Sequence, residues 1–383
     1  MREYLLVMLV AAVCTYLFSG LARRIAIRTG ALAPVRARDV HSTPTPYLGG
    51  AAMLFGVLAA FLLAANMPFL GRHPTVSHDA LGIFAAGAVI CIVGAVDDVI
   101  DLPWMAKIAG QVLAAGVAVL NGVRLYWVSL PNQIIALDQP SSILVTVLYI
   151  FVCVNAINLV DGLDGLAAGV AGIGAAAMFF YTYLLAYQQG FVVATTASLV
   201  TATIAGVCAG FLPHNFAPAK MFMGDSGAML LGVLLACSTL SLTGQIDSSA
   251  LSPSAGDILP ALLPIVLPIA MMALPLVDMT MAYVRRTWNG NWWFVADKQH
   301  LHHRLLRRGY STVKAVLILY MWTALVAFGV ILLGLKWSGL MVLVVLAGLT
   351  VAILVTTLPN RSARKAQLAA QAAGKETETV GTP

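Results

Sequence analysis

The sequence predicts an all-α, polytopic integral membrane protein with about 11 transmembrane helices. Of its 383 residues, 60% are hydrophobic and only 10% are charged, and the mean hydropathy is +0.90. Soluble globular proteins carry about 25% charged residues, so this composition excludes an ordinary soluble enzyme. The apolar residues are also gathered into segments of roughly 20, the length that crosses a hydrocarbon core. We therefore expect residues 1–358 to form a single transmembrane domain.

Taken in order, eleven apolar segments are expected to span the membrane. They lie at residues 4–21, 47–66, 80–96, 105–121, 142–157, 166–187, 191–212, 227–244, 259–278, 314–335 and 338–357. The first follows only Arg2 and Glu3 and lacks a small-residue cleavage site, so we expect a retained span rather than a signal peptide. The tail, residues 359–383, has no apolar face and is expected to be disordered or a frayed helix.

The basic residues indicate the orientation of these spans. With the N-terminus outside, 18 of the 22 Lys and Arg residues fall on the inner side, as the positive-inside rule requires, and the C-terminus is cytoplasmic. The net charge of +6 then follows from topology, and no nucleic-acid partner is needed to explain it. The unusual polar residues also fall at the inner ends of spans, so we expect any chemistry on the cytoplasmic face.

The five cysteines indicate packing rather than chemistry. None has the spacing of a metal-ligand pair, so we expect neither a disulfide framework nor a zinc site. All lie inside apolar segments: Cys14, Cys91, Cys153, Cys208 and Cys237.

The first inner loop contains basic residues that suit phosphate. Arg36, Arg38 and His41 precede two prolines and a glycine pair, which stiffen the entry into the second span. The alternative interpretation is positive-inside charge followed by a helix-entry turn. The sequence leaves open which of the three residues contacts a phosphate.

Three carboxylates lie at the inner end of the third span. Asp98 and Asp101 are one helical turn apart, Asp97 is adjacent, and Lys107 is near in sequence. Like charges this close raise one another's pKa or require a cation. The alternative is a solvated helix end.

A polar run from Asn155 to Leu166, N-A-I-N-L-V-D-G-L-D-G-L, interrupts otherwise continuous apolar chain. An aspartate at the centre of a membrane helix costs about 2.5 to 3.5 kcal/mol, so this run is expected at an interface or in a wet cavity. Its polar members recur every third residue, which on a helix would place them on one side facing a common space. The alternative is a turn between two membrane helices, where such residues are common. The four are Asn155, Asn158, Asp161 and Asp164.

The loop from His214 to Gly227 contains F-M-G-D-S-G. Asp225 suits either of two roles: it caps a helix beginning at Ser226, or it holds a divalent cation against phosphates. Phe222 offers an aromatic face and Asn215 an amide, the pair that stacks on and hydrogen-bonds a nucleobase.

The longest inner loop ends in H-L-H-H-R. His300, His302, His303 and Arg304 are expected to form a dense cationic group. The histidines lack the usual zinc spacings, so phosphate binding or acid/base work is favoured over a metal site. Upstream, the aromatic run 292–294 (Trp292, Trp293, Phe294) suggests a segment lying at the membrane interface.

Four of these motifs, in this order, resemble those of the polyprenyl-phosphate N-acetylhexosamine-1-phosphate transferases: D-D-x-x-D at 97–101, the 155–166 run, F-M-G-D-S-G at 222–227 and H-L-H-H-R at 300–304. The resemblance implies a Mg²⁺-dependent enzyme, with Mn²⁺ as a substitute. It would transfer a sugar 1-phosphate from a UDP-sugar to undecaprenyl or decaprenyl phosphate and release UMP. The implied setting is the bacterial plasma membrane, as a first step of envelope polysaccharide synthesis, with a homodimer left open.

The H-x-H-H-R pattern resembles the branch that uses UDP-N-acetylglucosamine. The sister branch, which transfers phospho-N-acetylmuramoyl-pentapeptide, typically carries three consecutive histidines and is kept as the alternative. By the same resemblance, Asp225 is the metal ligand, and Asp97 or Asp98 deprotonates or orients the attacking lipid phosphate. The implied catalytic set is Asp97, Asp98, Asn158, Asp161 and His302. The implied substrate-binding set is Gly162, Leu163, Asp164, Asn215 and Phe222 for uridine, and His300, His303 and Arg304 for the diphosphate or sugar.

A secondary transporter is the rival from another functional class. Its intramembrane aspartates would bind protons or sodium ions near the bilayer midplane. Here the carboxylates fall at the inner ends of spans and the outer side has no matching set, so the sequence favours the enzyme.

Overall fold

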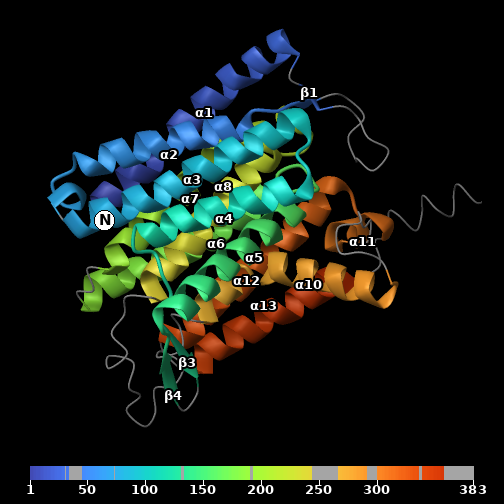
Figure 1. Ribbon diagram of the computed structural model, residues 1–383. Helices are drawn as coiled ribbons and strands as arrows, with labels where there is room; N and C mark the ends of the chain where they lie inside the picture. Colours follow the sequence, from blue (N-terminus) through green and yellow to red (C-terminus); the bar gives the residue numbers. More distant parts are fainter. Residues whose placement is uncertain are drawn as a thin grey trace, which may run out of the picture.

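The computed structural model is a bundle of helices that run roughly alongside one another (Figure 1). It describes residues 1–30, 32–33, 45–72, 74–130, 133–189, 193–243, 266–290, 300–335 and 339–357. Three groups of predictions lie outside these residues: the phosphate contacts of Arg36, Arg38 and His41, the interfacial segment with Trp292, Trp293 and Phe294, and the tail.

The helices of the bundle confirm a multi-pass membrane protein. Eight described helices are long and apolar enough to cross a bilayer, and α2 and α4 are shorter apolar helices of 17 residues. The bundle helices are α1 Arg2–Thr29, α2 Gly49–Ala65, α3 Pro74–Ile100, α4 Trp104–Leu120, α5 Gln139–Val160, α6 Leu166–Gln189, α7 Val193–Asn215, α8 Gly224–Thr243, α12 Thr312–Leu335 and α13 Gly339–Thr357.

The predicted ninth span, 259–278, differs from the structure at its inner end. Residues 266–271 are helical, Met272 forms a turn, and α10 then runs over Ala273–Trp288 with two arginines in its last turn. Pro275 lies in the first turn of α10 and has no N–H to donate to the carbonyl of residue 271, so an uninterrupted helix is disfavoured there. The helix that contains residue 278 therefore begins after the break at Met272 and continues to Trp288, so residue 278 is not a helix end.

Helix α8 is the centre of the bundle. All its residues from Ser226 to Thr243 are buried, and α2, α3, α5 and α7 pack around it. Glycines permit the closest approaches: a Cβ on Gly232 would lie 2.6 Å from Val154 Cα on α5, and one on Gly94 of α3 would lie 2.5 Å from Ser226 Cα. Small residues at helix contacts let membrane helices pack backbone to backbone.

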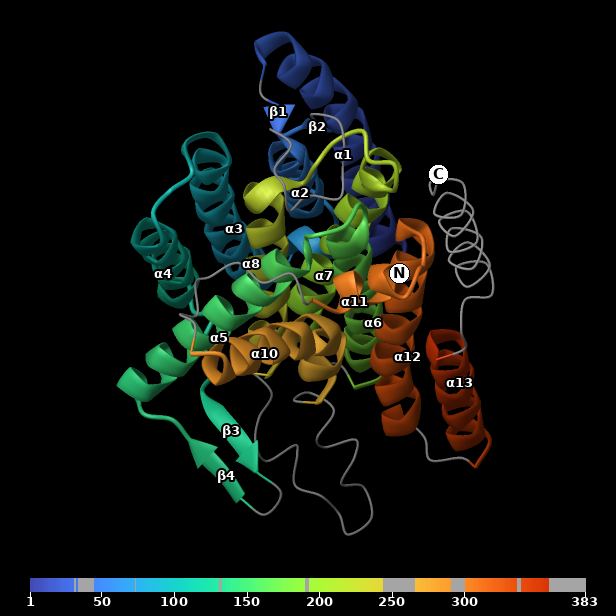
Figure 2. The ribbon, with the colours of Figure 1, turned by 90° about the vertical axis from the view of Figure 1, so that its right-hand side faces the viewer.

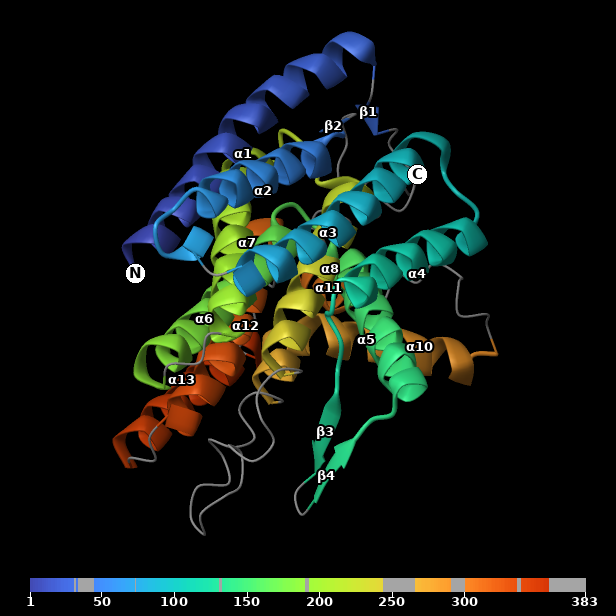
Figure 3. The same ribbon diagram turned by 60° about the vertical axis from the view of Figure 1, so that its left-hand side comes forward.

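Two small antiparallel sheets lie at opposite ends of the bundle. One joins β1 Leu32–Ala33 to β2 Thr45–Pro46. The other is the hairpin of β3 Trp127–Leu130 and β4 Gln133–Ala136, which connects α4 to α5 and projects away from the helices (Figure 3). The η1 turn, Leu70–Arg72, is near the N-terminus, where the Glu3 carboxylate accepts hydrogen bonds from the N–H groups of Phe69 and Leu70 at 2.9 Å. The all-α prediction missed these short strands.

The start of α2 and the strand before it are hydrogen-bonded to the residues just before α8. Phe222 N–H donates to the carbonyl of Pro46 at 2.9 Å, and Gly49 and Gly50 donate to the carbonyls of Phe222 and Met223 at 3.2 and 3.0 Å. A Cβ on Gly49 would lie 2.4 Å from the Phe222 oxygen, so this pairing requires a residue without a side chain. The glycine pair thus brings two distant loops together.

We predict that Gly232→Ala lowers the stability of the bundle by about 1 to 3 kcal/mol, because the added methyl overlaps the α5 backbone. Gly116→Ala is the control, since its Cβ would meet nothing within 4 Å on α4. Reversible unfolding in mixed detergent micelles provides the free energies. Equal stabilities for the two variants would contradict the close α5–α8 packing.

Candidate active site

The predicted polar motifs converge at one end of the bundle. The start of α8, the C-terminal ends of α3 and α5, the beginning of α4 and the short helix α11 (Leu301–Arg307) all lie there, and Figure 2 turns this end toward the viewer. The N-terminus and the β3–β4 hairpin lie toward the other end (Figure 1). The site is therefore built from segments far apart in the sequence.

Asp98 of α3 holds the first turn of α8. Its carboxylate accepts hydrogen bonds from Asp225 N–H at 2.8 Å, Ser226 N–H at 3.2 Å and Ser226 Oγ at 2.8 Å. The sequence-based alternative that Asp225 caps a helix beginning at Ser226 is wrong, because α8 begins at Gly224 and a carboxylate from another helix satisfies its N–H groups. Gly224 has a φ of 71°, which glycine adopts readily.

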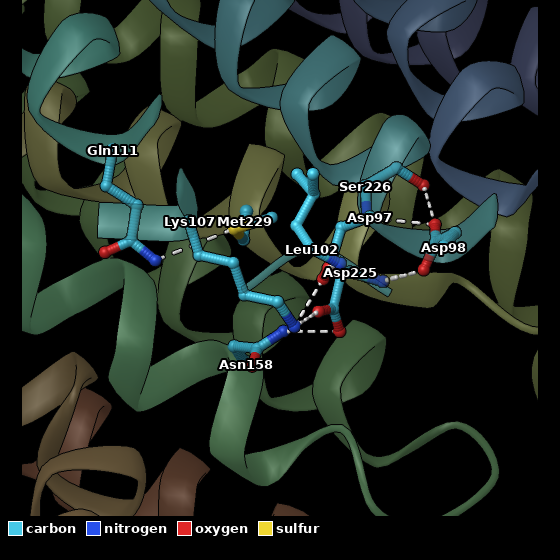
Figure 4. A network of polar contacts seen from close by, with 9 residues as sticks. All are labelled: Asp97, Asp98, Leu102, Lys107, Gln111, Asn158, Asp225, Ser226 and Met229. Atoms are coloured by element: carbon cyan, nitrogen blue, oxygen red, sulfur yellow. Dashed lines mark hydrogen bonds and ion pairs between the residues drawn. The ribbon is translucent and has the colours of Figure 1, made fainter. Parts of the chain in front are cut away.

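A second cluster joins Asp97, Lys107, Asn158 and Asp225 (Figure 4). The Lys107 ammonium lies 2.6 Å from Asp97 Oδ2 and 3.3 Å from Asp225 Oδ2, while Asn158 Nδ2 donates to Asp225 Oδ1 at 2.9 Å. Asp97 also accepts the N–H of Leu102 at 2.8 Å. Two carboxylates thus share one ammonium, each with a further hydrogen bond.

Lys107 was absent from the predicted site residues. The available signal was its isolation: it is the only charged residue in α4, an otherwise apolar helix. An ionisable residue within an apolar helix is a functional-site hypothesis by default.

The third carboxylate of the predicted cluster, Asp101, does not join Asp97 and Asp98. It is exposed beyond the end of α3 with a φ of 53°, and Asp225 is the carboxylate that approaches Asp97 and Asp98.

An amide pair, the buried Gln111 and the half-buried Asn155, lies one helical turn from this cluster. Asn155 Nδ2 donates to Gln111 Oε1 at 2.8 Å, and Gln111 Nε2 approaches Met229 Sδ at 3.7 Å. Gln111 follows Lys107 by four residues on α4, and Asn155 precedes Asn158 by three on α5, so the two polar layers are stacked. The pair therefore fixes how α4 and α5 present Lys107 and Asn158 to α8.

The predicted helical alignment of the 155–166 run is only partly correct. Asn155 and Asn158 lie on α5, but the helix ends at Val160, and residues 161–165 form a turn. Gly165 ends this turn with a φ of 78°, a conformation that glycine adopts at little cost. Asp161 and Asp164 therefore do not share a helix face with Asn155 and Asn158. For these two aspartates, the alternative prediction of a turn is correct.

Side chains from two segments hold this turn against the loop before α8. Asp164 Oδ2 accepts the N–H of Ala219 at 2.9 Å, and Asn215 Oδ1 accepts the N–H of Gly165 at 3.0 Å. Asn215 is 2% exposed, and its Nδ2 donates to the Met221 carbonyl at 3.0 Å. Both ends of this amide are engaged within the protein, so Asn215 helps to hold the turn, and a direct contact with uridine would have to use the second N–H or the second lone pair of the amide.

The other predicted uridine residues surround the same turn. Leu163 is buried, Gly162 is exposed at the surface of the turn, and Phe222 is half-buried in the loop that pairs with Pro46. The structure thus brings them to one region, and their contacts with a nucleotide stay predictions.

Asp161 is a half-buried carboxylate surrounded by like charges. In the described part of the chain, no N–H or O–H group donates to it. Burial, followed by the negative charges of Asp225, Asp98 and Asp164, raises its pKa to about 8. A cation or a proton is needed to neutralise this position.

The histidine helix α11 lies against the 161–165 turn. A Cβ on Gly162 would lie 2.7 Å from both Cε1 and Nε2 of His302, so the glycine makes room for the imidazole. Burial and the neighbouring His303 lower the pKa of His302 to about 3, which leaves this ring neutral. The predicted dense cationic group is therefore wrong for His302, because its buried position disfavours the charged form.

The remaining predicted residues of this loop differ in exposure. Arg304 is exposed on α11, His303 is half-buried 4.3 Å from the His302 ring centroid, and His300 is buried against Asp278 of α10. His300 Nδ1 lies 3.1 Å from Asp278 Oδ2, so its predicted contact with a substrate would use the other side of the ring. Asp278 was also absent from the predicted site residues.

Comparison with known proteins adds independent information. A family model described as glycosyl transferase family 4 matches residues 80–243. The chain is 45% identical over 333 residues to a decaprenyl-phosphate N-acetylglucosaminephosphotransferase of Mycobacterium tuberculosis, covering 86% of this chain and 82% of that protein. The Mycolicibacterium smegmatis protein of the same name is 42% identical, over 94% and 89% of the two chains. A probable undecaprenyl-phosphate N-acetylglucosaminyl 1-phosphate transferase of Bacillus subtilis is 34% identical, over 82% and 80%.

We predict that Gln111 and Asn155 are energetically coupled. Asn155→Leu alone or Gln111→Leu alone leaves an amide without its partner inside the bundle, whereas the double variant removes both groups. A double-mutant cycle should therefore give a coupling free energy of about 0.6 to 1.7 kcal/mol, the range found between polar groups of membrane helices. Unfolding in mixed micelles measures it, and strictly additive effects would contradict the pairing.

Proposed function

The chain belongs to glycosyl transferase family 4, and from this membership we propose that it transfers N-acetylglucosamine 1-phosphate from UDP-N-acetylglucosamine to decaprenyl or undecaprenyl phosphate, releasing UMP. The protein is an enzyme that transfers a sugar phosphate to a polyprenyl phosphate. The 45% identity over most of the chain is the observation that carries this conclusion. The relatives described above are all named for N-acetylglucosamine, which favours this sugar over the muramoyl-pentapeptide alternative.

The reaction requires an attacking phosphate, a leaving nucleotide and compensation of their negative charge. An oxygen of the polyprenyl phosphate forms a bond to the β-phosphorus of the donor, while the bond from that phosphorus to the bridging oxygen breaks and UMP leaves. Phosphoryl transfer of this kind depends mainly on positioning and electrostatic stabilisation. Lys107 places an ammonium group in this cluster, 3.3 Å from Asp225, and a cation at the reacting phosphates offsets their negative charge.

The two neighbouring aspartates of α3 are suited to different tasks. Asp98 is occupied by three donors from the start of α8, so its role is to position Asp225. Asp97 is buried and bonded to Lys107 and Leu102, beside the carboxylate of Asp225. We therefore assign to Asp97, rather than Asp98, the orientation or deprotonation of the acceptor phosphate.

The donor set fits magnesium. Asp225 and Asp161 provide hard carboxylate oxygens, and Asp161 lacks a donor among the described residues. Within the same residues, no three His, Cys, Asp or Glu side chains form a closed metal shell. Mg²⁺ commonly uses one or two carboxylates together with waters and substrate phosphates, so a closed shell is not required. Asp225 would hold the ion, which when bound neutralises diphosphate charge and polarises the phosphoryl oxygens.

The membrane orientation is proposed from charge. The positive-inside count supports a cytoplasmic position for the site end of the bundle and an outer position for the Glu3 end with the β3–β4 hairpin. A nucleotide-sugar donor is a cytoplasmic metabolite class, and the polyprenyl chain of the acceptor lies in the bilayer. The bacterial relatives support location in the bacterial plasma membrane.

The direct test of the function uses purified protein, decaprenyl phosphate and Mg²⁺ with one UDP-sugar at a time, following UMP release. We expect turnover with UDP-N-acetylglucosamine and none with UDP-N-acetylmuramoyl-pentapeptide. Preference for the muramoyl donor would overturn the assigned sugar, and UMP release without a lipid product would overturn the assigned acceptor.

We predict that Asp225→Asn reduces UMP release by about 100-fold or more, because an electrostatic group at the reacting phosphates is lost. Mn²⁺ binding, followed by electron paramagnetic resonance without substrates, should weaken in parallel. The control is Asp79→Asn, at the opposite end of α3. Near-normal Mn²⁺ binding by Asp225→Asn would exclude Asp225 as the ligand.

We predict that Phe222→Ala raises KM for the UDP-sugar by a factor corresponding to about 1 to 3 kcal/mol, the range for a base stacked on an aromatic ring. Phe222→Tyr keeps the ring and should retain a KM close to that of the wild type. Both are measured at saturating polyprenyl phosphate. An unchanged KM in Phe222→Ala would show that the ring does not stack on uracil.

A further inference from the structure

Asp278 is a buried carboxylate with two partners in the histidine segment. It is 1% exposed on α10. Its Oδ1 accepts the backbone N–H of Leu301 at 2.8 Å, and its Oδ2 lies 3.1 Å from His300 Nδ1. One oxygen thus holds the backbone at the start of α11, and the other holds a side chain.

These contacts continue toward the transfer site. His300 is the residue before the first turn of α11, and its ring is parallel to that of His302 within 8°, with the centroids 5.6 Å apart. His302 in turn lies against Gly162. An unbroken series of contacts therefore connects Asp278 with the turn that contains Asp161.

The charge of Asp278 determines which nitrogen of His300 carries a proton. Burial favours the neutral acid, but the hydrogen bonds from His300 and Leu301 outweigh it and hold the pKa of Asp278 below its usual value. An ionised carboxylate only accepts hydrogen bonds, so His300 Nδ1 must be the protonated nitrogen that faces it. The neighbouring acid thereby sets the orientation and protonation of the imidazole, as carboxylates commonly do for functional histidines.

We infer that Asp278 is a positioning residue of the transfer reaction, acting through the His300 side chain to place His302 over the 161–165 turn. This inference rests on the proposed function. The competing explanation is that Asp278 only caps the backbone of α11, since a buried carboxylate at a helix start performs that task as well. The two oxygens of Asp278 allow the explanations to be separated.

The variant Asp278→Asn distinguishes the two explanations, because an amide keeps one hydrogen-bond acceptor and puts a donor in place of the other. Its oxygen can still accept the Leu301 N–H, whereas its NH₂ group must donate to His300 Nδ1, which moves the ring proton to Nε2. Asp278→Ala removes both contacts. A capping role alone therefore predicts an active Asn variant and a damaged Ala variant, while positioning through His300 predicts that both lose activity.

We expect Asp278→Asn to keep the wild-type melting temperature and to lose about 10- to 100-fold in kcat, by analogy with carboxylate partners of metal-bound histidines. The ¹⁵N NMR signals of His300, assigned with His300→Gln, should change from an Nδ1-protonated to an Nε2-protonated ring. The double variant Asp278→Asn/His300→Gln should be no slower than His300→Gln alone, because both changes disrupt the same pathway. Asp278→Ala should lose thermal stability in addition.

Wild-type kcat in Asp278→Asn, or full additivity in the double variant, would overturn the inference and leave a helix cap. The rates are measured with whichever UDP-sugar the wild-type protein turns over, so a different sugar preference refutes the proposed donor without affecting this comparison. The NMR measurement needs no substrate. If the wild-type protein transfers no sugar phosphate, the proposed function fails, while an unchanged His300 signal in Asp278→Asn would overturn the inference by itself.

Discussion

The attachment of Asp98 to the first turn of α8 is the interaction on which the rest of the site depends. Helix α8 is surrounded by other helices, so the N–H groups at its start need partners from the protein. Asp98 supplies them, and this brings α3 against α8. Asp97 then comes beside Asp225, and Lys107 and Asn158 reach the same carboxylate from α4 and α5. Displacement of Asp98 would therefore shift Asp225 relative to Asp97, Lys107 and Asn158.

The same arrangement concentrates negative charge. Five carboxylates act on one another around the start of α8 and the 161–165 turn, and the Lys107 ammonium is shared by two of them, Asp97 and Asp225. Such a cluster is stable only with added positive charge or bound protons. This excess of carboxylate suits an enzyme that handles a metal ion together with a diphosphate. The Gln111–Asn155 hydrogen bond one turn below links the two helices that carry Lys107 and Asn158 to this cluster.

The loops of the site are fixed by reciprocal contacts between segments that are distant in sequence. Residues 46–50 pair with 222–223, Asn215 and Asp164 join the 161–165 turn to the loop before α8, and Asp278 holds the start of α11. Each contact satisfies a backbone N–H in a loop, in a turn or at the start of a helix. Predicted binding residues such as Asn215 and His300 therefore also have structural tasks, and substitution at these positions changes more than one property.

The sequence by itself determined the membrane class, the positions of most helices and the four polar motifs, because apolar length and local spacing are properties of neighbouring residues. It also singled out Asp97, Asp98, Asn158 and Asp225, which the structure brings together. Only the tertiary structure decided which carboxylate caps α8, that Lys107 lies between Asp97 and Asp225, that the 155–166 run bends at Asp161, and that Asp278 holds His300. Most of these outcomes depend on burial and on partners distant in sequence, since 127 residues separate Asp98 from Asp225 and 22 separate Asp278 from His300. No local pattern specifies which of several similar aspartates a distant helix will meet.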